Sequence, residues 1–224
     1  ELVEGKTTKL EKLRAIYDFV VTDIRYNAWE FGVHGYEPYS APVIFSRGFG
    51  DCKDKAILLR SMLTEVDIEC DPVLVYRSSP SGGRRWEEDL SLAMVNHFNH
   101  CIAFIPEQEG IPQEMFVDGT ARLNPLEELP YDDSGAQVLV VRKDGMSRMR
   151  IPFRDAEQNK LERRFTLSLN QDASGRANLE TRAHGKYDPS TRQGYAGGTE
   201  KRQERAERLM GSIFGALDGA VEAT

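Results

Sequence analysis

Residues 50–56 spell Gly-Asp-Cys-Lys-Asp-Lys-Ala, which places a cysteine at the first turn of a predicted amphipathic helix. Asp51 is a favourable N-cap residue. The apolar residues after it recur at helical spacing, towards an expected helix end near Glu65: Ile57, Leu58, Leu59, Met62 and Leu63. Because the N-terminal end of a helix carries partial positive charge, it favours the thiolate, the nucleophilic form of Cys52. The sequence therefore predicts a reactive cysteine at a helix start.

Two later segments supply groups that can act together with this cysteine. Residues 99–104, Asn-His-Cys-Ile-Ala-Phe, place His100 at the start of a predicted strand. Residues 116–120, Phe-Val-Asp-Gly-Thr, place Asp118 at the end of another. A cysteine, a histidine and an aspartate are the residue types that provide a nucleophile, a base and a carboxylate that orients the base.

In this order, the three segments resemble the bacterial transglutaminase-like superfamily, whose pattern has a G-D-C-K-D-K-A helix start, an F-N-H strand and a D-G/P-T strand end. The resemblance covers roughly residues 8–122, and Gly119 stands where proline is more usual. It implies an α+β fold with a papain-like core, in which the cysteine-bearing helix packs against an antiparallel sheet. It also implies that Cys52 is the nucleophile, His100 the base and Asp118 the residue that orients the base.

The resemblance implies a thiol-dependent enzyme that transfers or hydrolyses an acyl group at an amide through a thioester on Cys52. The superfamily includes cross-linking transglutaminases, cysteine proteases and amidases, so the substrate stays open, and a protein or peptide is expected. This chemistry needs no cofactor and no metal. The resemblance also favours a periplasmic or cell-surface setting and flanking domains in a longer parent chain. A catalytically silent protein-binding module with the same fold is the alternative.

The expected strand register brings His100 and Asp118 together. Residues 98–105 and 114–118 are predicted as neighbouring antiparallel strands. His100 would then lie directly opposite Asp118, with both side chains on one face of the sheet. His97 is an odd number of residues away, so on a continuous strand it would face the other side, and we expect it at the surface or packed under a loop.

An enzyme of this kind also needs hydrogen-bond donors for the oxyanion that forms on the attacked carbonyl. The backbone N–H of Cys52 is one candidate, because it lies at a helix N-terminus. An aromatic and glycine-rich loop follows residue 26 and is expected to contribute to the site. Tyr26, Trp29 and Tyr36 are candidates for a second donor, although each of these aromatics could instead serve only in packing.

A zinc site built from Cys52, His97, His100 and Cys101 is the main rival to this interpretation. Zinc sites usually take their ligands from short pairs such as C-x-x-C, which this chain lacks. The rings of His97 and His100 would also diverge on a strand. Cys70 and Cys101 lie in apolar, strand-like runs and are expected to fill the core.

The charged residues next to the cysteine are assigned to the surface of the helix. Lys53, Asp54 and Lys55 are expected on a solvated face, and Asp54 is also placed to help the cap. These acidic residues do not predict a calcium site, because no loop offers alternating oxygen ligands that end in a glutamate.

The composition is that of a soluble globular protein and excludes two broad classes. Of the 224 residues, 40% are hydrophobic and 29% are charged. The net charge of -7 argues against binding to nucleic acid. No apolar run approaches the roughly 20 residues that span a membrane, so we expect no direct membrane insertion.

Outside the cysteine helix, the pattern predicts a core followed by a smaller unit. In the core, a helix is expected over residues 8–22, capped by Thr7 or Thr8, with strands over residues 72–77 and 137–141. The pattern changes near residue 155. The elements expected after it are strands over residues 165–169 and 177–183 and an amphipathic helix over residues 199–217 that packs on them. We therefore expect a catalytic core over residues 1–157 and a small C-terminal β/α unit, not necessarily complete, over residues 158–224.

Overall fold

The computed structural model describes residues 1–28, 31–78, 90–91, 94–172 and 174–214 of the chain. Contacts within the chain divide it into two units, Glu1–Phe153 and Arg154–Thr224. The first unit ends shortly before residue 157, where the sequence pattern places the end of the core. Within the described ranges, no helix is both long and apolar enough to cross a membrane.

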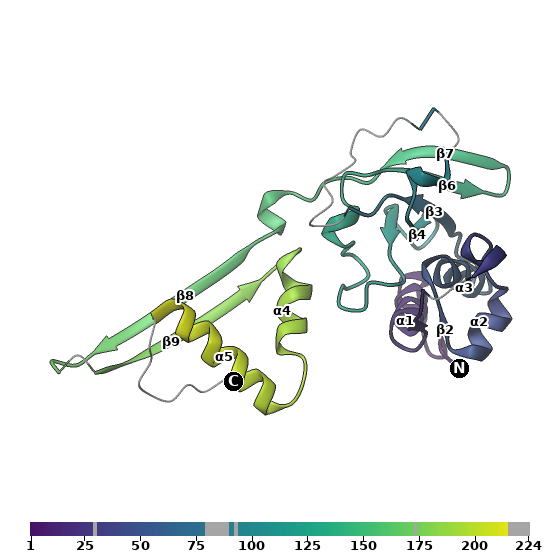
Figure 1. Ribbon diagram of the computed structural model, residues 1–224. Helices are drawn as coiled ribbons and strands as arrows, with labels where there is room; N and C mark the ends of the chain where they lie inside the picture. The colour runs from purple at the N-terminus through teal and green to yellow at the C-terminus, as the bar shows by residue number, and fades with distance from the viewer. Residues whose placement is uncertain (29–30, 79–89, 92–93, 173, 215–224) are drawn as a thin grey trace. The chain divides into compact units, whose positions relative to one another are not determined.

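The first unit combines three helices with a five-stranded antiparallel sheet (Figure 1). The helices are α1 (Lys9–Thr22), α2 (Ala41–Arg47) and α3 (Cys52–Thr64). The sheet has the order β5-β4-β3-β6-β7, formed by β3 (Asp71–Val75), β4 (His100–Ile105), β5 (Met115–Val117), β6 (Gln137–Arg142) and β7 (Gly145–Arg150). A short parallel pair, β1 (Arg25–Tyr26) and β2 (Phe49–Gly50), precedes α3. This is the α+β fold expected from the sequence, with the cysteine at the first residue of α3.

In the described part of this unit, three single 3₁₀ turns lie in the connections. They are η1 (Gly32–Gly35), η2 (Val95–His97) and η3 (Tyr131–Asp133). The last of them contains Asp133, whose side chain is fully buried.

Both long helices of the first unit begin with a reciprocal capping box. At α1, the Thr8 hydroxyl accepts a hydrogen bond from the Glu11 backbone N–H at 3.2 Å, and the Glu11 carboxylate accepts one from the Thr8 N–H at 2.9 Å. At α3, Asp51 accepts from the Asp54 N–H at 3.1 Å, and the Asp54 carboxylate accepts from the Asp51 N–H at 3.3 Å. The expected caps are confirmed, with Thr8 as the cap of α1.

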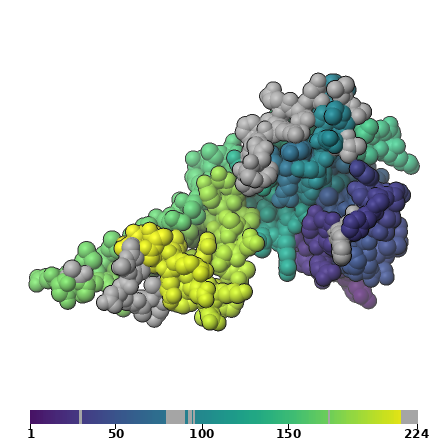
Figure 2. Space-filling view, viewed as in Figure 1, coloured from purple at the N-terminus to yellow at the C-terminus, as the bar shows by residue number. Residues whose placement is uncertain are grey.

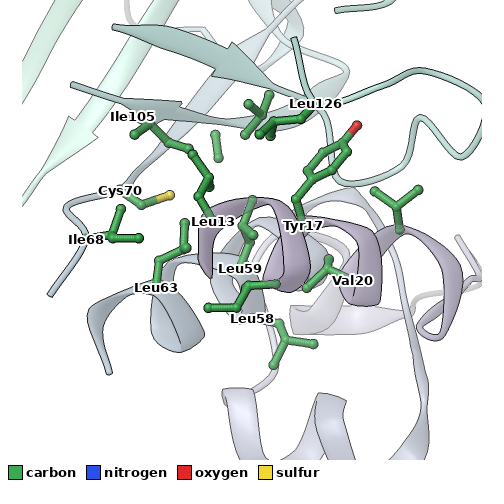
Figure 3. Packing of buried hydrophobic residues seen from close by; sticks show 14 of the residues in the cluster. Leu13, Tyr17, Val20, Leu58, Leu59, Leu63, Ile68, Cys70, Ile105 and Leu126 are labelled. Carbon is green, nitrogen blue, oxygen red and sulfur yellow. The ribbon is translucent and has the colours of Figure 1, made fainter. Parts of the chain in front are cut away.

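One hydrophobic core lies between the helices and the sheet. Leu13 and Tyr17 of α1 and Leu59 of α3 are each at most 2% exposed, and they pack against one another (Figure 3). Ala103 and Ile105 bring β4 into the same cluster. Burial of one such aliphatic side chain stabilises a fold by about 1.5–3 kcal/mol, so this packing holds α3 firmly against the sheet.

The opposite face of the sheet carries a second cluster. Its buried members include Val73, Val75, Ile102, Phe104, Val138 and Val140. Because side chains alternate along a strand, His100 shares this face with Ile102 and Phe104, whereas Ala103 and Ile105 face the helices. His100 therefore projects from the first residue of β4 on the face away from the helix core.

The pairing of β4 with β5 differs from the expected register by two residues. Ala103 pairs with Val117, whereas the expected register would pair it with Met115. The prediction that His100 lies directly opposite Asp118 is therefore wrong. Because the offset is an even number of residues, both side chains keep the same face of the sheet. A diagonal arrangement of this kind still leaves them within reach of each other.

The charged residues after Cys52 are not a solvated face, which corrects the expectation from the sequence. Lys53 is half-buried and paired with Asp51. Asp54 is fully buried and Lys55 is 1% exposed. The two buried groups have partners on neighbouring segments, which is the condition under which a protein interior tolerates charge.

The second unit is a β-hairpin followed by two helices. Its elements are η4 (Ala156–Gln158), β8 (Leu161–Leu169), β9 (Gly175–Ala183), α4 (Tyr187–Tyr195) and α5 (Thr199–Phe214). The two helices lie side by side at the surface of this unit (Figure 2), and the Phe214 ring of α5 lies 6.2 Å from that of Phe165 on the hairpin. The expected hairpin and its packing helix are confirmed up to Phe214, and the expected continuation to residue 217 lies outside the described residues. Among the described residues of this unit only Gly185 is buried, so its hydrophobic core is small.

Gly50 has no room for a side chain. A Cβ at this position would lie 2.6 Å from the Cβ of Asp54, which is held by its cap and ion pair. We therefore predict that Gly50→Ala lowers the free energy of unfolding by about 1–3 kcal/mol in urea denaturation. Gly35→Ala is the matched control, because no atom lies within 4 Å of its Cβ position, and its effect should stay under about 0.5 kcal/mol. Equal effects of the two substitutions would contradict the prediction.

The core should fold without the second unit, because both hydrophobic clusters are built from residues up to Ile151. A chain truncated after residue 157 should retain the circular dichroism spectrum of an α+β protein and unfold cooperatively. Its melting temperature should stay within about 4 °C of that of the full chain, the shift that about 1 kcal/mol produces at this size. Gradual melting without a transition would show that residues 158–224 are needed to complete the core.

Candidate active site

The structure brings Cys52, His100 and Asp118 together where α3 and β4 begin and β5 ends. His100 Nε2 lies 3.1 Å from Asp118 Oδ2, and the Cys52 side chain is close enough to the His100 ring to raise its pKa. Cys52 is half-buried, whereas His100 is 9% exposed and Asp118 is 1% exposed. The three groups form a continuous line from a partly accessible thiol to a buried carboxylate.

Bonds around the first turn of α3 explain why Cys52 has this position. The Asp54 carboxylate accepts a hydrogen bond from the Tyr39 backbone N–H at 2.9 Å and is paired with Arg47 at the end of α2. Arg47 Nε donates to the Phe49 carbonyl at 2.7 Å. These bonds tie the start of α3 to the loop before α2 and to β2, so the backbone at Cys52 is fixed from both directions.

Lys55 ties the same helix to two further segments. Its Nζ donates to the Ile24 carbonyl, just before β1, at 2.7 Å. Its Cβ lies 3.5 Å from the position that a Cβ would take at Gly119, in the turn after Asp118. Burial lowers the Lys55 pKa to about 8, although the negative charge of Asp118 acts in the opposite direction.

Asp118 is held as a carboxylate by four hydrogen bonds. Thr120 donates to Oδ1 from its backbone N–H and from its hydroxyl, each at 2.7 Å. His100 and Arg77 both reach Oδ2, each at 3.1 Å. Burial raises the Asp118 pKa, but the bond and charge of His100, the charge of Arg77 and the bond from Thr120 outweigh it and hold the pKa below its usual value.

His100 carries the complementary charge. Burial lowers its pKa, but the hydrogen bonds with Asp118 and Cys52 and the negative charges of Asp118 and Asp133 raise the pKa to about 10. The ring is therefore an imidazolium at neutral pH. The positive charge of this ring lies beside the Cys52 side chain.

Arg77 is a part of this site that the sequence analysis missed. It follows β3, and Asn99 holds its backbone in both directions: the Arg77 N–H donates to Asn99 Oδ1 at 2.7 Å, and Asn99 Nδ2 donates to the Arg77 carbonyl at 3.0 Å. The side chain reaches Asp118, and Arg77 Nη1 also lies 3.4 Å from His100 Nε2. The asparagine directly before His100 was the one signal in the sequence that pointed to this arrangement.

Asp133 is a second residue that the sequence analysis missed. It lies in η3, is fully buried, and has no hydrogen bond to either carboxylate oxygen from the residues that the structure describes. Its Oδ1 lies 4.0 Å from Arg77 Nε. Burial and the negative charge of Asp118 raise its pKa to about 7. No sequence pattern separates it from Asp132 in the same acidic turn.

The side chains of His100, Asp118 and Asp133 are close enough to consider as a metal site, since their ligand atoms lie within 4.8 Å of one another. The guanidinium of Arg77 already supplies positive charge there and shares Asp118 Oδ2 with His100. We therefore assign no metal ligands to this cluster. Cys101, from the zinc set considered in the sequence analysis, faces the side of β4 opposite to His100.

Of the aromatic candidates for a second oxyanion donor, the structure places Tyr26 near the thiol. Tyr26 is 49% exposed and pairs with Gly50 in the β1–β2 ladder, and partial burial together with the negative charge of Cys52 raises its pKa to about 12. Its hydroxyl is therefore a proton donor at neutral pH. Tyr36 is 76% exposed after η1, and in the described part of the chain it has no hydrogen bond to Cys52. Trp29 lies outside the described residues.

His97 and the other two cysteines are buried residues that pack within the fold. His97 lies in η2 rather than on a continuous strand, is 8% exposed, and packs its ring 6.2 Å from that of Phe98. Cys70 and Cys101 are 5% and 7% exposed, and burial raises the pKa of both thiols, that of Cys70 to about 12. The expectation that these two cysteines fill the core is confirmed.

A solved structure has a fold similar to that of this chain. A crystal structure of a "putative protease" from Parabacteroides distasonis ATCC 8503 aligns with a TM-score of 0.53 and 15% sequence identity. The alignment covers 75% of this chain and 31% of that one, so this chain spans about a third of its neighbour's length. At this identity the likeness concerns the fold alone, and a search of the curated proteins gave no match.

The first part of the chain also matches the sequence profile of a known family. Residues 1–104 match the profile of the transglutaminase-like superfamily, a stretch that contains Cys52 and His100 and ends before Asp118. The antiparallel sheet with a cysteine at the start of α3 agrees with this match. Over residues 1–104, just under half of the chain, the sequence is therefore similar to the transglutaminase-like superfamily, which includes transglutaminases and cysteine proteases.

Proposed function

We propose that this chain is a thiol-dependent enzyme that hydrolyses or exchanges an amide bond of a protein or peptide through a thioester on Cys52. The observation that carries the proposal is the line from the half-buried thiol through His100 to the Asp118 carboxylate, 3.1 Å from the ring. The superfamily match supports the same chemistry. None of its steps requires a cofactor.

The reaction proceeds by acyl transfer to sulfur and then away from it. The Cys52 thiolate attacks the carbonyl carbon, and the electron pair of the C=O bond moves onto oxygen. As this intermediate collapses, the C–N bond breaks, and His100 gives its proton to the leaving amine. Water or a second amine then attacks the thioester and gives a proton to His100, and the thiolate leaves. Asp118 orients the ring throughout and stabilises it in the steps where it is an imidazolium.

The backbone N–H of Cys52 is suited to stabilise the oxyanion. It lies at the first residue of α3, where helix N–H groups lack intrahelical acceptors. Within the described residues, the Cys52 N–H has no hydrogen-bond acceptor of its own. The Tyr26 hydroxyl is the second donor that we propose. Loss of one such donor typically slows an acyl transfer by about 10²–10³-fold.

A catalytically silent binding module is the rival proposal. A buried carboxylate and a buried imidazolium add little to the stability of a fold, because their desolvation offsets much of their attraction. A binding module has no need of such a pair beside a cysteine. The reactivity of the thiol separates the two proposals.

Cys52 should react with limiting iodoacetamide before Cys70 and Cys101 do, because only its thiol is partly accessible and lies beside an imidazolium. At pH 6.5 its rate should exceed that of glutathione by at least about tenfold, measured by mass spectrometry of the labelled peptides. A rate equal to that of glutathione would favour the binding module. Earlier labelling of Cys101 would show that the nucleophile is wrongly assigned.

The activity is tested with a denatured protein such as casein, with and without a fluorescent primary amine. Peptide fragments would indicate hydrolysis, and incorporation of the amine would indicate acyl transfer. Cys52→Ser should reduce either product by more than about 10³-fold. Product formation that survives in Cys52→Ser would contradict the thioester mechanism.

His100→Ala should slow alkylation of Cys52 at pH 6.5 by at least about tenfold, because the imidazolium that favours the thiolate is removed. Asp118→Asn should act in the same direction with a smaller loss, since the ring loses its carboxylate but stays in place. His97→Ala is the matched control, and its rate should stay within about twofold of the wild type. If His97→Ala abolished the reactivity and His100→Ala preserved it, the base would have to be reassigned.

A further inference from the structure

Asp133 is a buried carboxylate that the proposed mechanism does not use. Neither of its oxygens has a hydrogen-bond partner in the described part of the chain, and its side chain is fully buried. A carboxylate in this state destabilises a fold whenever it is charged. Packing and stability therefore do not account for an aspartate at this position.

The groups around Asp133 are the charged groups of the candidate site. From the end of β3, Arg77 Nε lies 4.0 Å from Asp133 Oδ1. His100 on β4 and Asp118 after β5 place their atoms within 4.8 Å of an Asp133 oxygen. Asp132 is the acidic neighbour on η3 itself. Asp133 therefore faces a guanidinium, an imidazole and a carboxylate, which come from three different segments.

Among Arg77, His100, Asp118 and Asp133, with Cys52 left aside, the charges balance only when Asp133 is ionised. Arg77 and His100 both bond to Asp118 Oδ2 at 3.1 Å, and they lie 3.4 Å from each other. Two cations thus share one carboxylate, and the guanidinium disfavours an imidazolium beside it. An ionised Asp133 supplies the second negative charge, at distances where buried charges are only weakly screened.

We propose that Asp133 is a positioning residue of this site, whose carboxylate neutralises Arg77 and so leaves the charge of Asp118 to stabilise the His100 imidazolium. This inference rests on the proposed function and adds a fourth group to the three that carry out the chemistry. Protonation of Asp133 leaves Arg77 without its counter-charge, and the imidazolium then loses its proton more readily.

The titration behaviour of the cluster supports this role. Burial and the charge of Asp118 raise the Asp133 pKa to about 7, while the charges of Arg77 and His100 act against that rise. Reciprocally, the charge of Asp133 contributes to the raised pKa of His100. The ionisation of Asp133 therefore falls in the neutral range and is linked to the charge on the imidazole.

An NMR titration of the His100 ring in the full chain tests the inference. Asp133→Asn keeps the shape of the side chain and removes its charge, so the proton affinity of His100 should fall by about tenfold or more. Arg77→Gln removes the guanidinium and should raise that affinity. The His100 signals are assigned by their loss in His100→Gln.

Asp132→Asn is the matched control, because it removes the same charge one residue earlier from a half-buried side chain. The proton affinity of His100 should then stay within about threefold of the wild type. Identical His100 titrations in the wild type and Asp133→Asn would overturn the inference. An equally large fall in Asp132→Asn would overturn it too, because the effect would then not be specific to Asp133.

Thermal unfolding gives a second readout and shows that the variants fold. The Asp133 pKa is raised from 3.8 to about 7 in the folded state, so the wild type loses stability as the pH rises through this window. Asp133→Asn lacks this loss, and its advantage in melting temperature should grow between about pH 4.5 and pH 7.5. A constant difference across this range would overturn the claim that Asp133 ionises in the folded protein.

Failure of this inference can be told from failure of the proposed function. Fast alkylation of Cys52, combined with an unchanged His100 titration in Asp133→Asn, would reject the role of Asp133 and leave the proposed enzyme standing. Slow alkylation of wild-type Cys52 would reject the proposed enzyme itself, and with it the role that Asp133 has there.

Discussion

The buried carboxylate of Asp54 is the group on which the position of the thiol depends. It closes the capping box of α3, accepts a hydrogen bond from the Tyr39 backbone and pairs with Arg47. The start of α3 cannot shift along its axis without breaking charge-assisted bonds in the interior, where an unpaired carboxylate is strongly unfavourable. Gly50 leaves the space that Asp54 occupies. Cys52 is therefore placed by contacts that are local in the sequence.

The partners of the thiol are placed in a different way, by strand pairing over long distances in the chain. His100 is set by the pairing of β4 with β3, where it lies opposite Val75. Asp118 is set by the pairing of β5 with the other edge of β4, where Val117 lies opposite Ala103. The line of three groups therefore forms only when the sheet and α3 have packed together. In the unfolded chain the cysteine has neither the helix end nor the histidine beside it.

The sequence predicted the elements that carry local signals and missed those that lack them. The first helix and the cysteine helix have capping residues and apolar stripes, and the C-terminal hairpin alternates along its first strand. By contrast, α2 has seven residues and no side-chain cap, and β7 is a polar strand whose pattern does not alternate. The register of β4 with β5 was wrong by two residues, because a pattern of period two fixes the face of a strand and leaves even shifts open.

The sequence did not predict which charged residues lie in the interior, and the candidate site is built around such residues. Asp54 and Lys55 were assigned to the surface because charged side chains usually lie there, and only their tertiary partners make burial tolerable. Asn99 was the only sequence signal for Arg77, and Asp133 had none, because both residues reach the site through the sheet order that sets them around Asp118. Cysteine, histidine and aspartate could be recognised by residue type and order, since those residues define the chemistry. The charged residues that shift the pKa of the histidine could not be recognised in this way. A buried charge is defined by its neighbours in space and not by its place in the chain.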